Sequence, residues 1–255
     1  MKTFLFALLL AAAPPCATAF ADDGKLTIYM GGKPVASETY SIQKSDGKIQ
    51  IDGSGKAEIG PMKVDIERFK VVTDGKYQLI SASAKATMGQ AKMAAETTFG
   101  DGKARNEITT GPEPKMKEDD MHADAIVINS NLPLYPWSMM TMRAKLDNAD
   151  PQEFHAYVIG QAEVPLTVIF QGKESVEFAG KKAELNHLSA SLPTPQGQVT
   201  KLEFWVNDDR KIIKIAVPAQ GVEAYQEGWN RKAPPVVAKP DADAGTELKP
   251  DKKKP

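Results

Sequence analysis

Sulfur and imidazole donors lie close together in one short segment of the chain. Met116, Met121 and His122 are expected to share a loop. Thioether sulfur and imidazole nitrogen suit Cu(I), so this group predicts copper handling as an alternative function. Methionine is also an adaptable filler of irregular apolar space, and the packing interpretation therefore stays open beside the metal interpretation.

The sequence lacks the residue patterns that are typical of catalysis. Its three histidines are His122, His155 and His187, and none belongs to a His-Glu-x-x-His zinc motif. The Gly-Ser-Gly run at residues 53–55 lacks the spacing of a nucleophile elbow. The acidic run that begins at Glu118 is typical of a solvated loop. We therefore expect a protein that is not an enzyme and needs no cofactor.

One segment has helical rather than strand periodicity. Tyr135, Met139, Met142 and Leu146 recur at helical spacing, and Pro136 occupies a first-turn position. This predicts a helix over 136–147, whose burial would contribute roughly 6–12 kcal/mol. A helix of this kind needs an apolar surface, and we expect it to cover the concave face of a sheet. The side chains predicted to line an apolar ligand cavity and its lid are Leu134, Tyr135, Trp137, Met139, Met140, Met142 and Leu146.

Residues 1–21 have the features of a secretory signal peptide. Lys2 precedes an apolar run from Phe4 to Ala13, and small residues allow cleavage after Ala19 or Ala21. Such a cut removes Cys16 and leaves a mature chain without a thiol. The sequence therefore predicts a periplasmic or secreted protein that does not span the membrane.

Residues 231–255 differ in composition from the rest of the chain. This segment is rich in proline and contains seven basic and four acidic residues. It has too few large apolar groups to offset the entropy of ordering, so we predict a disordered tail. Its positive charge suits contact with an envelope protein or an anionic surface.

The composition of the whole chain limits the classes of partner. Of the 255 residues, 42% are hydrophobic and 25% are charged, and the formal net charge is −1. A balanced charge argues against nucleic acid as a partner, and the apolar fraction allows a substantial core.

A repeated tripeptide organises residues 22–230. Asp-Gly-Lys begins at Asp23, Asp46, Asp74 and Asp101, and Asp-Gly between alternating apolar residues is a strong hairpin signal. A second group of alternating segments follows residue 150, which gives about a dozen strands in total. An antiparallel sheet of that size must curl, so we predict one strongly curved half-barrel or open barrel.

The layout as a whole resembles a known group of proteins. The features that carry the resemblance are the turn at residues 31–35, the central helix, the strand pair around residues 172–181 and the closing segment 204–218. Together they look like bacterial envelope proteins catalogued as domains of unknown function, and more distantly like the periplasmic lipoprotein carriers. The resemblance implies a curved antiparallel half-barrel whose hollow holds apolar matter, and it implies no catalytic residue.

These features predict an exported carrier or binding protein for a lipid, an acyl chain or another apolar molecule. Two alternatives remain open. One is the copper-handling function of Met116, Met121 and His122, and the other is an envelope scaffold whose core is filled by its own side chains.

Overall fold

The computed structural model describes residues 20–129, 132–178, 180–193 and 198–229. Within these ranges the strands form one 15-stranded sheet, in which neighbours follow the chain order almost throughout. The predicted mainly β fold, with a single curved sheet, is confirmed. Residues 1–19 of the predicted signal peptide, Cys16 among them, and the predicted tail at 231–255 lie outside the described residues.

The first half of the sheet is an antiparallel meander of eight strands. These strands are β1 (Phe20–Met30), β2 (Lys33–Ser45), β3 (Lys48–Ile59), β4 (Met62–Asp74), β5 (Leu79–Met88), β6 (Ala91–Gly100), β7 (Lys103–Thr109) and β8 (Lys115–Asp120). Positive φ at Asp46 and Gly47 forms the β2–β3 turn, as the Asp-Gly pattern predicts.

The second half contains the remaining seven strands. They are β9 (Ile126–Ile128), β10 (Gln152–Val158), β11 (Ala162–Phe178), β12 (Lys181–Pro193), β13 (Val199–Val206), β14 (Ile212–Val217) and β15 (Val222–Gln226). β9 runs parallel to β10, and all other pairings are antiparallel. The first strand pairs with the last, with Leu26 opposite Gln226, and this ladder joins the two halves.

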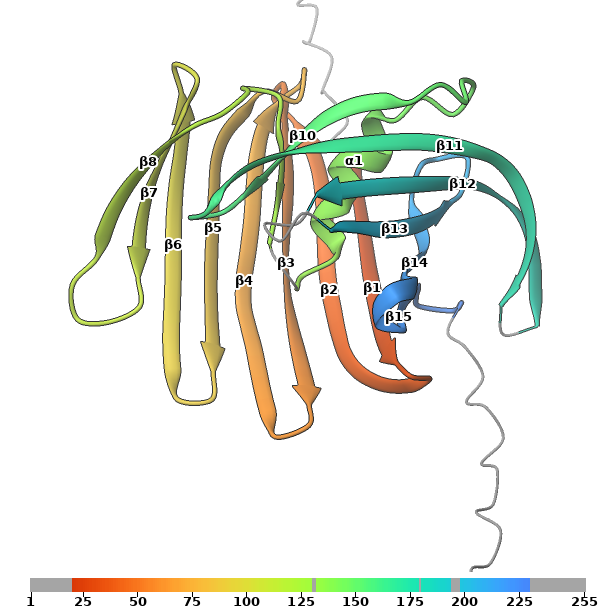
Figure 1. Cartoon of the computed structure of the whole chain (residues 1–255), viewed down its shortest axis with the longest axis horizontal. Helices are drawn as coiled ribbons and strands as arrows, with labels where there is room; N and C mark the ends of the chain where they lie inside the picture. Colours follow the sequence, from red (N-terminus) through yellow and green to blue (C-terminus); the bar gives the residue numbers. More distant parts are fainter. Residues whose placement is uncertain (1–19, 130–131, 179, 194–197, 230–255) are drawn as a thin grey trace, which may run out of the picture.

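Irregular pairing bends the long strands. The β4–β5 register shifts between Ile66 and Arg68, so β4 contains a bulge there. β11 is one long bent strand, because the register shift between Phe170 and Gly172 turns the strand without ending it. Bulges increase local twist. Figure 1 shows β11 arching across the sheet as a result.

The central helix is shorter than predicted. A 3-10 turn, Tyr135–Trp137, leads into α1, Ser138–Arg143, so the segment ends four residues before 147. Ala144 has extended backbone angles, and the Arg210 guanidinium donates to the Met142 and Ala144 carbonyls, which ends the helix. In Figure 1, α1 lies between the two halves of the sheet. Among the described residues, no helix has the length and apolar composition needed to cross a bilayer.

Candidate functional site

The segment that contains α1 occupies the interior of the curved sheet. Leu134, Tyr135, Trp137, Met139 and Met140 are at most 5% exposed and belong to the main core cluster. Met142 and Leu146 are half-buried and pack against the same cluster. The structure therefore brings all seven predicted cavity residues into contact with the core, where they fill much of the space that a cargo would need.

A buried carboxylate holds the start of this segment. Glu38 of β2 is 1% exposed, and its two oxygens accept the Leu134 N–H at 2.9 Å and the Tyr135 N–H at 3.2 Å. Burial raises the pKa of Glu38 from 4.5 to about 7, although the two backbone N–H bonds oppose that rise. The carboxyl group thus anchors the segment, and its burial favours the protonated form.

Two glycines make room for the aromatic rings that pack around this anchor. A Cβ on Gly24 would lie 2.2 Å from the Tyr40 ring, and one on Gly53 would lie 2.8 Å from the Tyr135 ring. The two tyrosine rings stack with their centroids 5.5 Å apart. The Tyr135 hydroxyl donates to the Phe69 carbonyl at 2.6 Å. The beginning of the segment is therefore closely packed against β1 to β4.

The following turn contacts the other half of the sheet. The Trp137 ring lies 5.6 Å from the Phe204 ring, centroid to centroid, and is 4% exposed. The Thr141 hydroxyl donates to the Arg210 carbonyl at 3.0 Å. These contacts connect α1 to β13 and to the β13–β14 connection, so the segment bridges the two halves.

A cavity of about 390 Å³ remains beside the end of α1, and we call it the α1 cavity. Its apolar and aromatic wall comes from Tyr40, Ile42, Tyr77 and Met142. Its polar lining consists of Asp22, Lys44, Ser138, Asn207, Asp209, Arg210 and Lys211. The Lys211 ammonium contacts the Asp22 carboxylate at 2.5 Å, and both side chains are about a quarter exposed. The cavity therefore presents apolar groups and charged groups of both signs to the same space.

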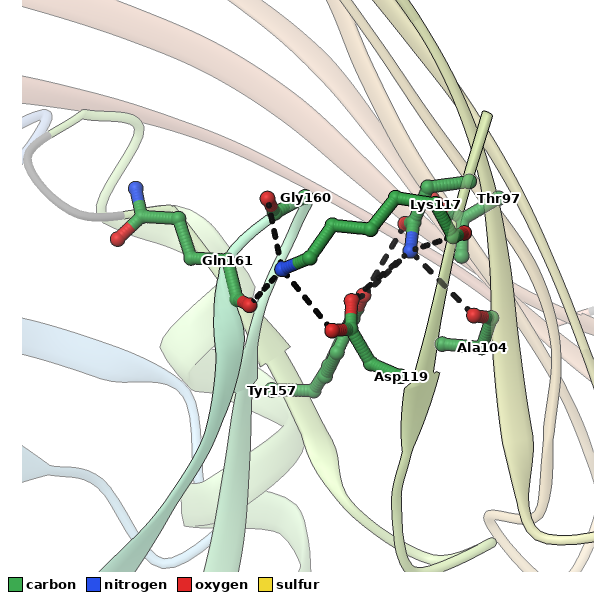
Figure 2. Close-up of polar contacts among 8 residues, drawn as sticks. Thr97, Ala104, Lys117, Asp119, Tyr157, Gly160 and Gln161 are labelled. Carbon is green, nitrogen blue, oxygen red and sulfur yellow. Dashed lines mark hydrogen bonds and ion pairs between the residues drawn. The ribbon is translucent and has the colours of Figure 1, made fainter. Parts of the chain in front are cut away.

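A second polar group holds the two edges of the sheet together (Figure 2). Asn106 of β7 is fully buried and donates to the Tyr157 hydroxyl of β10 at 2.8 Å. That hydroxyl donates to Asp119 of β8 at 2.9 Å, and burial raises the pKa of Tyr157 to about 12. The Lys117 ammonium contacts Asp119 and the carbonyls of Gly160 and Gln161. These side-chain contacts join β7 and β8 to β10 and have a structural role. We call this group of residues the seam.

The three residues predicted to bind copper lie in different surroundings. Met116 is on the edge strand β8 and is 72% exposed, whereas Met121 is 8% exposed and belongs to the core cluster. His122 instead contacts His155 and Glu163, neither of which was in the predicted set. Copper binding by this trio stays a prediction, and the structure groups its histidine with other ligands.

Three residues of these sites, Glu38, Asp22 and Lys211, were not among the predicted site residues. A signal for Glu38 was present, because it alternates in phase with Ala36, Tyr40 and Ile42, all of which are buried. The Asp22–Lys211 pair joins β1 to the residue before β14. No local pattern could have placed these two side chains together.

The fold defines an open, β-barrel-like sheet with an internal helix. It is similar to the crystal structure of a β-barrel-like protein of the domain of unknown function DUF1849 from Brucella abortus. The TM-score is 0.54 and the identity 9%, over 81% of this chain and 94% of that one. A DUF1089 family protein from Pseudomonas aeruginosa matches with a TM-score of 0.41 and 11% identity, over 86% of this chain and 98% of that one.

These likenesses concern the fold alone. The likeness to the DUF1849 protein confirms the predicted resemblance to a domain of unknown function with a curved sheet, while the envelope location and the likeness to lipoprotein carriers stay predictions. No family model and no curated protein matches the chain.

Proposed function

We propose that this protein is an exported, non-enzymatic binding protein that holds an amphiphilic molecule, such as a fatty acid, in the α1 cavity. The observation that carries the proposal is the lining of that cavity, which combines Ile42 and Met142 with charged groups of both signs. Small-molecule sites are concave, mostly apolar and provided with a few polar anchors, and they typically measure about 300–1,000 Å³. The α1 cavity has this size and concave form, and its polar groups outnumber its apolar ones, which favours an amphiphilic ligand over a purely apolar one.

The lining also indicates how such a ligand would lie. An acyl chain would contact Ile42, Tyr40 and Met142, and the unbranched Met142 side chain can adapt to ligands of different shape. A carboxylate or phosphate head group would face Lys44 and Lys211. The side chains of residues 134–146, which we call the α1 segment, fill the rest of the interior. We therefore expect the cavity to bind a short acyl chain or one end of a longer acyl chain.

A larger depression elsewhere is less suited to this role. It measures about 760 Å³ and is lined mainly by polar residues of β1 to β4, including Thr39, Asp52 and Arg68. Arg68 and Asp52 already form a bidentate pair, with N–O distances of 3.0 and 2.5 Å. Its lining includes Tyr40 but no aliphatic side chain comparable to Ile42 or Met142, so it suits an acyl chain less well.

Export is part of the proposal, and the structure favours one of the two predicted cleavage sites. β1 begins at Phe20, and Phe20 and Ala21 pair with Lys44 and Gln43 of β2. Cleavage after Ala19 would leave β1 whole, whereas cleavage after Ala21 would remove two paired residues. N-terminal sequencing of the mature protein tests this expectation, and a start at Asp22 would contradict it.

A cavity-filling substitution tests the binding proposal. In Met142→Trp, the larger side chain should occupy the α1 cavity and lower the affinity for a fluorescent fatty acid analogue at least tenfold. Met88→Trp is the matched control, because Met88 is 42% exposed on β5 and lies outside the cavity lining. Equal binding by both variants would contradict the proposed site. A wild-type protein that binds no acyl probe would favour the scaffold with a filled core.

A further inference from the structure

Two histidines and one glutamate from three separate segments converge on a single point. His155 of β10 and Glu163 of β11 are diagonal neighbours in an antiparallel pair, since His155 is opposite Pro165. His122 belongs to the connection after β8. The His122 Nδ1 lies 2.6 Å from the Glu163 Oε1, and the His155 Nδ1 lies 3.0 Å from the same oxygen. Both imidazoles therefore face one carboxylate oxygen.

The carboxylate is held in place independently of the imidazoles. Its second oxygen, Oε2, accepts the backbone N–H of His122 at 2.6 Å, and the Glu163 side chain is only 14% exposed. The His155 side chain is 37% exposed and the His122 side chain 60% exposed. The group is thus fixed on the protein side and open to solvent on the other, as a site that loads an ion from solution requires.

We propose that His122, His155 and Glu163 form a binding site for a divalent transition-metal ion of the Zn²⁺ class. Two imidazole nitrogens and one carboxylate oxygen are a donor set that Zn²⁺ accepts, with a fourth position left to water. One possible ligand atom from each residue lies within 4.8 Å of the other two. Bonds of about 2.0–2.2 Å to a common ion would place the donor atoms about 3.4 Å apart, which is close to their present separations from the Glu163 oxygen.

The rings must rotate for this to happen. They now stack with centroids 3.6 Å apart and an interplanar angle of 13°, and an ion cannot lie in both ring planes at once. His122 is the ring that can turn, because most of its side chain is exposed. The ion would then occupy the place of the two N–H groups that now face Glu163, with each imidazole in the tautomer that carries its proton on Nε2.

This site differs from the copper prediction in its ligands and in the ion it selects. The donors are nitrogen and oxygen, which suit Zn²⁺ better than Cu(I), and no thioether is involved. It also lies apart from the α1 cavity, whose lining contains none of the three residues. A bound ion would fasten the connection after β8 onto the β10–β11 hairpin, beside the seam described above.

Isothermal titration of Zn²⁺ into the purified full chain without an affinity tag tests the proposal, with Co²⁺ absorption as a second readout. We expect one ion per chain, and an affinity that falls at least tenfold in His155→Ala and in Glu163→Gln. His187→Ala is the matched control. His187 also lies between an aromatic ring, Trp205, and a carboxylate, Glu203, but has no second imidazole. Its removal should leave Zn²⁺ binding unchanged.

Thermal unfolding in EDTA shows whether each variant is folded before its affinity is interpreted. Absence of Zn²⁺ binding by the wild type would overturn the proposal. If the variants then also unfold at a lower temperature, the three residues form a stabilising hydrogen-bonded contact and not a metal site. Binding that survives both His155→Ala and Glu163→Gln, or that is lost in His187→Ala, would also overturn it. Met116→Leu should have no effect, and a loss there would favour the thioether interpretation instead.

Discussion

The two ends of the α1 segment differ in how completely they fill the curved sheet. At the first end, Glu38, Tyr40 and Tyr135 are at most 5% exposed and fit closely against β1 to β4. At the second end, Met142 is half-buried and borders a cavity of about 390 Å³. The same short helix therefore serves as a core element at one end and as a cavity wall at the other. The lining of that cavity reaches from Met142 back to Ser138 and Tyr40, so ligand capacity depends on the space left along this side of the helix.

The largest effect is expected at the filled end, from Tyr135→Ala. This change removes a fully buried ring and the hydroxyl that donates to the Phe69 carbonyl, so the free energy of unfolding should fall by about 3–5 kcal/mol. Urea denaturation measures the change. Tyr135→Phe is the control and should lose only about 1 kcal/mol, since the ring stays in place. A cost below 1 kcal/mol for the alanine variant would show that the segment is not a core element.

Two methionines on the same helix provide a direct comparison of its ends. Met140 is fully buried, and Met140→Ala should cost about 2–5 kcal/mol in unfolding free energy. Met142→Ala should cost less than about 1 kcal/mol, because Met142 already borders an empty space. Parallel urea titrations measure the pair. Equal costs would remove the distinction between the filled and the hollow end.

Glu38 makes the stability of the filled end depend on pH. Its pKa is raised by burial from 4.5 to about 7, so the folded protein holds this proton more tightly than the unfolded chain does. The contribution of Glu38 to stability is therefore fully present below about pH 4.5 and is lost as the pH rises through 7, by up to roughly 3 kcal/mol. Glu38→Gln should abolish that part of the dependence and be the more stable protein at pH 8. Identical pH profiles for the two proteins would contradict this.

The smallest effect is expected at the rim of the α1 cavity. Lys211→Gln removes the charge that faces Asp22, but the glutamine amide can still donate a hydrogen bond to that carboxylate, so the loss of unfolding free energy should stay at about 1 kcal/mol. The affinity for an anionic acyl probe should nevertheless fall, because a cation is removed from the lining. Thermal unfolding and probe titration measure the two quantities. A large loss of stability with unchanged affinity would assign Lys211 to the core instead.

Local sequence patterns predicted the strands well but predicted only some of the turns correctly. Asp46 and Asp101 adopt the positive φ that an Asp-Gly hairpin requires. Asp74 instead accepts the N–H groups of Lys76 and Gln78 and makes a longer loop. The turn expected at Asp23 is wrong, because Gly24 lies inside β1, where the absence of a side chain makes room for Tyr40. The Asp-Gly-Lys pattern alone does not show whether its glycine is required for a positive φ or because a neighbouring side chain occupies the place of a Cβ.

Only the part of the candidate site that lies in one continuous segment, residues 134–146, could be predicted from the sequence. Helical spacing correctly grouped Tyr135 with Met139, since both face the core. The helix ends where Arg210, from the β13–β14 connection, donates to its last carbonyls. His122 contacts His155 only because the curvature of the sheet brings the end of β8 close to β10. These contacts join residues more than 30 positions apart. The sequence alone does not specify such pairs before the sheet topology is known.

Native mass spectrometry of the full chain, purified under mild conditions and offered a fatty acid, tests the central claim most directly. We predict one bound fatty acid in the wild type, a matching complex in Met88→Trp, and only the mass of the protein in Met142→Trp. A wild-type protein that stays free of fatty acid, or a Met142→Trp protein that binds as much as the wild type, would contradict the claim that the α1 cavity is the binding site.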